Sequence, residues 1–491
     1  MNKSKTFSLG GIIMIEKIEK FFGVFFSIFN GLEGNTEEFI ARIKFHVYNK
    51  LTHSVSVHQM LSTYPSEAME RLGMKKIPSE RSLYRTLERI GKYFPIILER
   101  YQVFIKKHGL VDNKQITDFS STYLEGTKAD LGDYGHSSEK RPDKKQIKFG
   151  ISTGINGIPT ALTIQKGNTQ DKKLMKAVLK IIQKVIPKHS ILIYDAGANT
   201  KANKRKIRNM GYHYLTLKAK KTNVYKKYIN YFRTKHKEGK VKNFVMKERH
   251  YFCVKKREDD EINYIFFCPE LYDEHIKIKE GKFKREKEKG NKLLRKRKTE
   301  KVPSDKGWVE LIPQLQKTLF TIDNPYINGT EGFFIIECSV DDESEKILKL
   351  YKERDKAEKF IRALKEGLEL RPIRHWNDWS IIGIFFICFL TNFLINLTLF
   401  LNEKMEKENA NKEKVPHRNP EKFDSIIEDK KDSTVKNVKL LKKYLMNLCL
   451  TVVYPEKGFR FTILSNVSAV VLKIFGDFVW KYEDKSLDLR W

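Results

Sequence analysis

Residues 351–365 read Tyr351-Lys-Glu-Arg-Asp-Lys-Ala-Glu-Lys-Phe-Ile-Arg-Ala-Leu-Lys365. The stretch has neither Pro nor Gly and is rich in residues that favour helices, so it predicts one continuous helix. At roughly 100° per residue, an arc of about 60° holds four polar side chains. They are Tyr351, Arg354, Glu358 and Lys365. One face of the predicted helix therefore carries a single carboxylate together with two cations and a phenol.

Taken alone, this face has an ordinary alternative, because solvated helices often carry salt-bridge pairs three or four residues apart. A second stripe of the same helix is apolar and predicts packing on a core. It consists of Phe360, Ile361, Leu364 and Leu368. The choice between a solvated face and a functional one depends on the rest of the chain.

The composition favours a polyanionic partner. The 491 residues are enough for two to four domains with a sizeable core. Lys and Arg number 94 against 61 Asp and Glu, which gives a net charge of +33. This excess predicts nucleic acid as the partner. A membrane surface is the competing partner, but the basic residues are spread along the chain rather than placed beside an anchor.

Cysteine usage and the amino terminus favour a cytosolic protein. The five cysteines lie far apart, without CxxC pairs or the spacing of metal ligands, so reduced thiols are expected. The apolar start is interrupted by Glu16 and Lys17, which is unlike a signal peptide. Met14 is an alternative translation start.

One segment, Ser380–Phe400, is long and apolar enough to cross a membrane. Asn392 and Asn396 lie four residues apart on one face of this predicted helix. Such amides are costly in lipid and common inside a large protein. The segment therefore predicts a buried core helix, and no membrane is expected as a partner.

Residues 1–110 predict a helical DNA-binding domain. Three short helices are expected at Val55–Tyr64, Ser66–Leu72 and Ser79–Tyr93, with Ser79 as a candidate N-cap. The last of them has an apolar face and a separate ridge of arginines, namely Arg81, Arg85 and Arg89. This pattern is typical of a helix-turn-helix that reads DNA. An ordinary helical bundle with a solvated basic face is an equal alternative on this segment alone.

Residues 111–217 predict an α/β segment. Strands are expected at Gln115–Thr122, Lys148–Thr153, Ile158–Ile164, Ser190–Tyr194 and Tyr212–Leu217, and helices at Asp171–Ile186 and Lys201–Met210. Asn156-Gly157 is a strong hairpin turn between the second and third strands. Asp118 lies on the first strand, and Asp195 directly follows the fourth.

The remaining regions differ in composition. Residues 218–345 predict a β-rich basic insertion whose densest stretch, Lys282–Lys301, is expected to be a mobile solvated loop. Residues 346–400 return to the helix quoted above, which is expected to start at about Glu343, and to the apolar helix. Residues 401–435 predict a charged linker without structure. Residues 436–491 predict a helical end, with helices in Lys436–Val453 and Thr462–Phe478.

Three acids occupy positions typical of one catalytic layout. Asp118 on a first strand, Asp195 after a fourth strand and Glu358 on a later helix match the order of a ribonuclease-H-like core. There the first and fourth strands are neighbours, so the three carboxylates converge and bind hard cations. Individually, each aspartate also fits a structural role, as a strand-edge residue or a turn cap.

With these residues, the chain resembles insertion-sequence transposases of the DDE superfamily. The group it resembles has the signature Tyr-x2-Arg-x3-Glu-x6-Lys and a β-rich insertion between the second Asp and the Glu. Tyr351, Arg354, Glu358 and Lys365 match all four positions of that signature. The segment Gly135–Gln146 supports the resemblance and is expected to be structural rather than a DNA contact. Relatives often have an aromatic residue in place of Asp355.

The resemblance implies a fold, an activity and roles for the residues named above. The fold is α/β, with a ribonuclease-H-like core interrupted by the insertion and flanked by helical regions. Asp118, Asp195 and Glu358 would be catalytic and would hold two Mg²⁺ or Mn²⁺ ions. Tyr351, Arg354 and Lys365 would hold DNA phosphates. Further DNA contacts are expected from the arginine ridge, Arg81, Arg85 and Arg89.

The implied enzyme binds the terminal inverted repeats of its element, cuts double-stranded DNA there and joins the 3′-hydroxyl groups to target DNA. A homodimer is expected in the DNA complex, and a prokaryotic cytoplasm, at the nucleoid, is the expected location. Two alternatives stay open. One is a nuclease of the same fold without strand transfer, and the other is an inactive sequence-specific DNA-binding protein.

Overall fold

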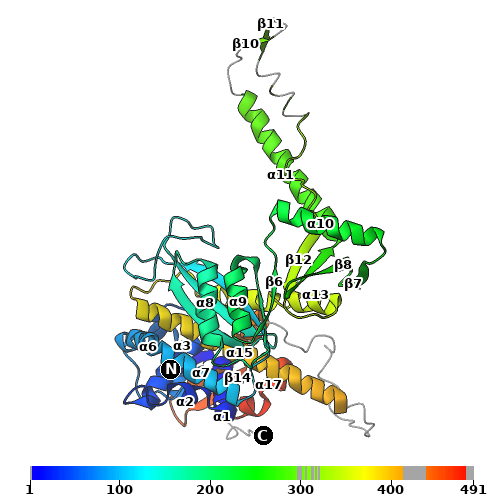
Figure 1. Ribbon diagram of the computed structural model, residues 1–491. Helices are drawn as coiled ribbons and strands as arrows, with labels where there is room; N and C mark the ends of the chain where they lie inside the picture. Colours follow the sequence, from blue (N-terminus) through cyan, green and yellow to red (C-terminus); the bar gives the residue numbers. More distant parts are fainter. Residues whose placement is uncertain are drawn as a thin grey trace, which may run out of the picture. The chain divides into compact units, whose positions relative to one another are not determined.

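The structure of the chain is a computed structural model that describes residues 3–295, 301–304, 307–310, 315, 318, 321–412 and 438–482 (Figure 1). These residues form two compact units of mixed α/β structure. Unit 1 holds Met1–Ile193, Arg205–Tyr212 and Glu353–Trp491, and unit 2 holds Tyr194–Lys204 and His213–Lys352.

Unit 1 starts with one strand and a group of helices. The elements are β1 (Lys3–Ser8), α1 (Gly10–Phe22), α2 (Val24–Phe29), α3 (Thr36–Leu51), α4 (Val57–Thr63), α5 (Ser66–Arg71), α6 (Glu80–Lys92) and α7 (Phe94–Lys107). The three predicted short helices are confirmed as α4, α5 and α6. Ser79 caps α6 as predicted, because its Oγ accepts a hydrogen bond from the Ser82 N–H at 3.2 Å.

The two ends of the chain share a sheet that the sequence did not predict. β1 pairs antiparallel with β13 (Cys449–Tyr454), which pairs with β14 (Phe461–Ser465). The predicted helices at Lys436–Val453 and Thr462–Phe478 are therefore wrong in part, and only α16 (Val438–Asn447) and α17 (Ala469–Trp480) are helical. The β-branched residues of β13 suit a strand once a partner is available. Residues ahead of Met14, such as Leu9 and Ile12, are fully buried.

The central strands of unit 1 are β2 (Lys114–Tyr123), β3 (Gln146–Gly154), β4 (Pro159–Lys166) and β5 (Ile191–Tyr194), and their spatial order is β4-β3-β2-β5. The predicted strands are confirmed, and the first and fourth are neighbours. The hairpin turn is confirmed at Gly157, whose φ of +82° lies in the region that glycine tolerates. Helices α8 (Asp171–Ile182) and α9 (Lys201–Asn209) follow the predictions, although α8 ends four residues early.

The helix predicted across residues 351–365 is not continuous. It consists of α13 (Ser344–Lys352), α14 (Asp355–Arg362) and a π-helical turn, η2 (Ala363–Gly367). A turn separates the first two, in which the Lys356 N–H donates to the Glu353 carbonyl at 2.9 Å. Asp355 and Glu358 both lie in the first turn of α14, where carboxylates favour a helix start.

This break means that the four signature residues do not share one helix face. Tyr351 lies on α13, Arg354 on the turn, Glu358 on α14 and Lys365 in η2. The apolar stripe is confirmed, since Phe360, Ile361, Leu364 and Leu368 are all buried.

The apolar segment forms α15 (Asp378–Lys412) in unit 1. By length and composition it is the one described helix that could cross a membrane, and 78% of its apolar window is buried inside the structure. That burial supports the core-helix prediction. Asn392 donates from Nδ2 to the Phe360 carbonyl at 3.2 Å, and Asn396 donates to the Asn392 carbonyl at 2.7 Å. The linker predicted from residue 401 is wrong up to Lys412, which is still helical, and 413–435 lie outside the described residues.

Helices α6 and α15 cross at two glycines. A Cβ on Gly91 would lie 1.9 Å from the Trp379 carbonyl oxygen, and one on Gly383 would lie 2.0 Å from that of Leu87. Both contacts are with backbone, so neither neighbour can yield by changing a rotamer. The glycines therefore set how closely α6 approaches α15.

Unit 2 is built on five strands in the order β6-β12-β9-β8-β7, joined antiparallel where they pair. They are β6 (His213–Leu217), β7 (Lys242–Met246), β8 (Arg249–Glu258), β9 (Glu261–Phe267) and β12 (Phe333–Cys338). The short helix η1 (Ala196–Ala198) and the hairpin β10 (Lys301–Ser304) and β11 (Gly307–Glu310) also belong here. Helix α10 (Thr222–Lys237) packs its Tyr225, Ile229 and Phe232 against this sheet.

The predicted β-rich insertion also contains long helices. Besides α10, helix α11 (Pro269–Arg295) leads away from the strands of unit 2 (Figure 1). Most of the predicted loop Lys282–Lys301 is therefore helical, and 296–300 lie outside the described residues. Lys and Glu favour helices, and Lys282 lies 3.9 Å from Glu286 one turn later.

Candidate active site and nucleic-acid interface

The first candidate acid, Asp118, lies in the middle of β2. Its neighbours on both sides of the strand are largely buried, while Asp118 itself is partly exposed. Its Oδ1 accepts a hydrogen bond from the Phe119 N–H at 2.9 Å. The strand thus presents a carboxylate to solvent from an otherwise packed element.

The last candidate acid, Glu358, lies on α14, which packs against β2 and β3 within unit 1. Its Oε1 forms an ion pair with Arg354 Nη2 at 2.7 Å. The side chains are 41% and 23% exposed, so the pair is accessible to a ligand. The buried side of α14 carries Ala357 and Phe360, and this packing directs the polar side of the helix away from the core.

The second candidate acid, Asp195, belongs to unit 2. It directly follows β5 and starts η1, where its Oδ1 accepts from the Ala196 N–H at 2.7 Å. Four residues on, Asn199 donates from Nδ2 to the Leu217 carbonyl at 3.0 Å and to Glu337. The backbone after Asp195 is thereby attached to β6 and β12. Tyr351, also in unit 2, is partly exposed on α13.

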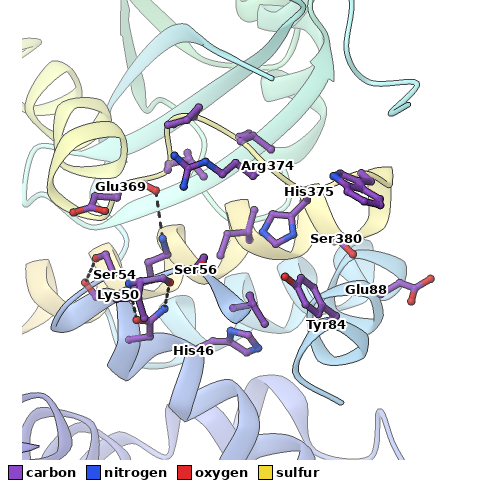
Figure 2. A pocket seen from close by; sticks show the side chains of 18 of the residues that line it. His46, Lys50, Ser54, Ser56, Tyr84, Glu88, Glu369, Arg374, His375 and Ser380 are labelled. Atoms are coloured by element: carbon purple, nitrogen blue, oxygen red, sulfur yellow. Dashed lines mark hydrogen bonds between the residues drawn. The ribbon is translucent and has the colours of Figure 1, made fainter. Parts of the chain in front are cut away.

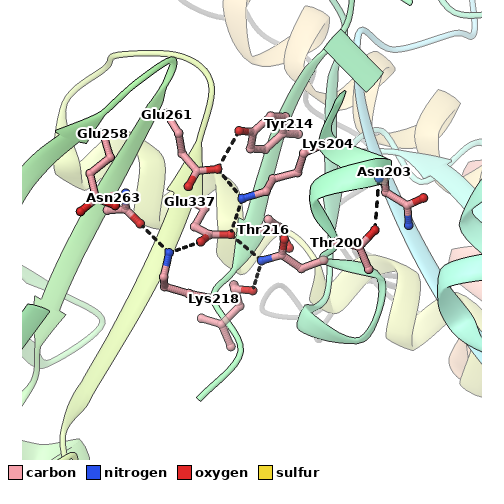
Figure 3. A network of polar contacts seen from close by, with 12 residues as sticks. Thr200, Asn203, Lys204, Tyr214, Thr216, Lys218, Glu258, Glu261, Asn263 and Glu337 are labelled. Carbon is pink, nitrogen blue, oxygen red and sulfur yellow. Dashed lines mark hydrogen bonds and ion pairs between the residues drawn. The ribbon is translucent and has the colours of Figure 1, made fainter. Parts of the chain in front are cut away.

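Glu337 is the centre of a buried ion network in unit 2 (Figure 3). It pairs with Lys218 and, at 3.1 Å, with Lys204, which also pairs with Glu261. Burial acts to raise the pKa of Glu337, but hydrogen bonds from Lys218 and Asn199 and the charge of Lys204 outweigh it, so the pKa is lowered. The positive charges of Lys204 and Lys218 thus neutralise the negative charges of Glu337 and Glu261.

Lys365, the last residue of the signature, is buried in η2 with 9% of its side chain exposed. Its Nζ lies 3.0 Å from Glu139 Oε1, in an ion pair outside the angles of a hydrogen bond, and donates to Ser138 Oγ at 3.0 Å. Arg371 Nη1 approaches the same Glu139 oxygen at 3.5 Å. Burial lowers the pKa of Lys365, and Glu139 opposes that effect. Lys365 therefore attaches residues 138–139 to the end of the α14 region.

The segment Gly135–Gln146, to which Glu139 belongs, is held by its own contacts. Gln146 is fully buried and donates from Nε2 to the carbonyls of Arg141 and Lys144, both at 2.9 Å. The exposed Arg141 pairs with Asp143 at 2.7 Å. These bonds agree with a structural role for the segment.

The arginine ridge of α6 is exposed along its full length. Leu83, Leu87 and Ile90 on the opposite side are fully buried, as expected for an amphipathic helix. Arg89 pairs with Glu33 at 2.5 Å. Arg81 and Arg85 instead line a cleft of about 870 Å³ in unit 1, shown in Figure 2.

Residues 110–391 match the family model described as the transposase DDE domain. The match covers more than half of the chain. The chain belongs to the transposase DDE domain family. No curated protein matches the chain. Among solved structures, it is similar to a piggyBac transposase synaptic complex with hairpin DNA, at 9% identity and a TM-score of 0.40. That similarity covers 85% of this chain and 88% of the other.

The acids of this transposase suit a divalent cation by their chemistry. Asp118, Asp195 and Glu358 offer partly exposed carboxylate oxygens, which are the ligands that Mg²⁺ and Mn²⁺ prefer. Within the described part of the chain, no group of three or more His, Cys, Asp or Glu side chains lies assembled for a metal. Asp118 and Glu358 lie on packed elements of unit 1, whereas Asp195 lies in unit 2.

Sequence reasoning missed several polar residues of the transposase. Lys50 and Arg374 line the same cleft as Arg81, and Glu139 holds Lys365. Lys50 lies on a helix with no motif around it, so its sequence gives no signal. Arg374 has a weak one, because it lies with Arg371 in a loop that leads to the exposed Trp376.

Proposed function

We propose that this member of the family is a DNA transposase that cuts DNA at the ends of an insertion sequence and joins the freed 3′-hydroxyl groups to target DNA. The observation that carries the proposal is the packing of α14, with Glu358, against β2, with Asp118, in a chain of the transposase DDE domain family. Partly exposed acids on two packed elements are what a hydrolytic site needs.

The core of the enzyme is, in this proposal, ribonuclease-H-like. The neighbouring positions of β2 and β5 support it, because Asp118 lies on the first of these strands and Asp195 follows the second. Asp118, Asp195 and Glu358 are proposed as the catalytic acids. When bound, two Mg²⁺ or Mn²⁺ ions would supply an activated water or hydroxyl group and stabilise the leaving oxygen.

The other signature residues receive different roles. Arg354 orients the Glu358 carboxylate through its ion pair, and its planar guanidinium also suits a DNA phosphate. Tyr351 is proposed to contact the phosphate backbone as well. For Lys365, burial and the pair with Glu139 support a positioning role instead, in which it holds residues 138–139 beside η2.

DNA is the proposed partner throughout. The exposed arginines of α6 are proposed to contact the terminal inverted repeats, with the basic insertion adding contacts to the backbone. Both ends of the element must be held together, so a homodimer is proposed in the DNA complex. A prokaryotic cytoplasmic setting at the nucleoid is proposed with it.

The proposed division of labour follows the regions of the sequence. Residues 1–110 bind DNA, 111–217 and 346–400 form the core, and 218–345 are an insertion. The remaining part is a C-terminal region at 436–491.

Cleavage of a labelled DNA fragment that carries the element's own end tests the function. The wild-type protein is incubated with Mg²⁺ or Mn²⁺ beside two variants, Glu358→Gln and Asp355→Asn. Both substitutions remove one negative charge from the first turn of α14, but Asp355 only pairs with the exposed Lys359 at 2.5 Å. We expect cleavage at the element boundary by the wild type and by Asp355→Asn, and none by Glu358→Gln or with a chelator.

The products separate the proposal from its alternatives. Joined DNA products support transposition, whereas cleavage without joining identifies a nuclease. Binding of the ends without cleavage by any of the three proteins would identify an inactive DNA-binding protein and overturn the proposal.

A further inference from the structure

The cleft beside α6 joins parts of unit 1 that are far apart in the sequence (Figure 2). One wall comes from α3 and the residues after it, including Lys50 and Ser54. A second wall is the exposed side of α6. The third is the segment 369–377, which connects η2 to α15. The cleft has a volume of about 870 Å³.

The charge of the lining is strongly positive. Five cationic side chains face two acidic ones, a net charge of +3, and they are Lys50, Arg81, Arg85, Arg371 and Arg374 against Glu88 and Glu369. Burial is the main cause that lowers the pKa of His46 to about 3 and that of His375 to about 4, and the charge of Lys50 contributes to both shifts. Both imidazoles are therefore neutral at pH 7 and leave the cationic excess unchanged.

Most of these cations lack an acidic partner. Arg371 pairs with Glu366 and Glu139. Within the described residues, the other four cations of the lining form no ion pair with a carboxylate. Cations gathered in one concave surface repel one another, so a bound anion would relieve this repulsion.

Lys50 is the most informative of the four. The residue is only 6% exposed, and its Nζ donates to the backbone carbonyl of Glu369 at 3.4 Å, which is long for a charged donor. A buried ammonium group with one weak partner is costly. An anion in the cleft would supply the missing partner.

The opening of the cleft adds exposed groups suited to a phosphate. Arg81 and Arg85 lie one helical turn apart, and Arg374 comes from the segment 369–377. Trp376 is 70% exposed, and Lys128 Nζ lies 5.5 Å from the centre of its ring, which places one more cation at the rim. The planar forks of arginine bind phosphate oxygens in pairs.

We propose that this cleft binds the phosphate backbone of a DNA strand, with one phosphate at Lys50 and its neighbours at Arg81, Arg85 and Arg374. The proposal rests on the proposed function and extends it to residues outside α6. A strand fits better than a single small anion, because the cations are distributed over three walls. The segment 369–377 follows the π-helical turn that holds Lys365, and that turn continues α14. A DNA strand bound in the cleft would therefore contact a segment that is continuous in sequence with the helix of Glu358.

The salt dependence of duplex DNA binding tests the proposal in the full-length protein. The variants are Lys50→Met and Arg374→Gln, and the matched controls are Lys184→Met and Arg141→Gln. Both control residues are exposed and pair with an acid in unit 1, Lys184 with Glu99 at 3.3 Å and Arg141 with Asp143 at 2.7 Å. Removing one cation that binds a phosphate makes the slope of log K against log salt shallower by about 0.9. We expect this shallower slope in the two cleft variants and the wild-type slope in the controls.

Thermal unfolding without DNA gives a second readout. Because Lys50 is buried without a carboxylate, Lys50→Met should raise the Tm of the DNA-free protein while it weakens DNA binding. A lower Tm together with an unchanged salt slope would make Lys50 a structural residue and overturn the proposal.

The remaining outcomes are also decisive. Equal reductions of slope in the control variants would show that the cleft has no special part in binding and would overturn it. A second outcome would also overturn the proposal. Inorganic phosphate could raise the Tm of the wild type but not of Lys50→Met, while the salt slopes of DNA binding are equal for the two proteins. The cleft would then bind a free anion and not DNA. Failure of DNA cleavage with the expected reduction of slope would affect the proposed function alone.

Discussion

The two units bury lysines in opposite ways. In unit 2, Lys204 and Lys218 surround the carboxylate of Glu337. In unit 1, Lys50 and Lys442 bind neutral oxygens: Lys50 donates to the Glu369 carbonyl, and Lys442 donates to Ser54 Oγ at 3.0 Å and the Gly367 carbonyl at 2.8 Å. A lysine paired with a buried acid is a feature of the fold. A buried lysine without one is costly to the fold, and for Lys50 this cost is part of the argument for a phosphate bound in the cleft.

The largest effect is expected from Glu337→Gln. The substitution keeps the shape of the side chain but leaves Lys218 without its carboxylate, and breaking a buried pair typically costs about 3–5 kcal/mol. Denaturant unfolding should show a loss of that order. Glu345→Gln, at an exposed position on α13, serves as the control and should change the free energy of unfolding by less than about 0.5 kcal/mol. If Glu337→Gln and Glu345→Gln lowered the free energy of unfolding equally, the lysines around Glu337 would not depend on its charge.

The next largest effect is expected from replacing Lys442, which should change how the free energy of unfolding depends on pH. Burial lowers its pKa from 10.5 to about 8. Between these values the unfolded chain binds the proton and the folded chain does not, so this group makes stability rise with pH from about 8 to 10.5. Below pH 8 it is charged in both states, and its burial costs roughly 3 kcal/mol.

Lys442→Met should therefore raise the free energy of unfolding at pH 7 and remove the rise above pH 8. Lys439→Met, on an exposed position of the same helix, should leave the pH profile as in the wild type. Unfolding measured across this pH range checks both. Identical profiles for the two variants would contradict the assignment of the rise to Lys442.

A smaller loss is expected from Gly383→Ala, which tests the packing that supports the cleft. The new methyl group would lie 2.0 Å from the Leu87 carbonyl oxygen, and overpacking of this kind costs about 1–3 kcal/mol. Gly281→Ala is the control, because nothing lies within 4 Å of its added Cβ in helix α11, and it should stabilise slightly. Thermal unfolding compares them. A stable Gly383→Ala protein would show that α6 and α15 can separate at little cost.

The smallest effect is expected for the coupling energy between Lys365 and Glu139. Lys365→Met alone leaves the buried Glu139 with the weaker partner Arg371, whereas Lys365→Met combined with Glu139→Gln removes both charges. The double variant should recover about 1 kcal/mol of the loss in unfolding experiments, since contacting residues couple. Its slope of DNA binding against salt should equal that of the wild type. A reduced slope would make Lys365 a phosphate ligand instead of a positioning residue.

Local patterns predicted the elements that depend on neighbours in sequence. The strands that carry Asp118 and precede Asp195, the capped helix α6 and the apolar helix α15 are all where periodicity and turn residues indicated. The break before Asp355 was missed, because helix propensity sums over the stretch and does not show that a second helix start is stabilised by acids. The four signature residues occur at the expected spacing in the sequence, but they lie on different elements and do not share one helix face.

Long-range contacts account for most of what was missed. The pairing of β1 with β13 depends on residues near opposite ends of the chain. The ion pair of Lys365 with Glu139, and the cleft that joins Lys50 to Arg374, likewise need distant segments to meet. A single sequence contains no signal for contacts between distant segments, since neither contacting residue belongs to a recognisable sequence motif.

The glycine crossing of α6 and α15 has a consequence for retargeting this protein to other DNA sequences. In the proposed function α6 contacts DNA, and exchanging such a helix for one from another protein is a direct way to change the preferred DNA sequence. Here any replacement for α6 would need a glycine at 91, and its backbone at Leu87 would have to pass directly against Gly383. With the proposed role of α6 in DNA binding, specificity would be redesigned on the outward side chains of α6, while a graft of a foreign helix would have to be accompanied by a matching redesign of α15.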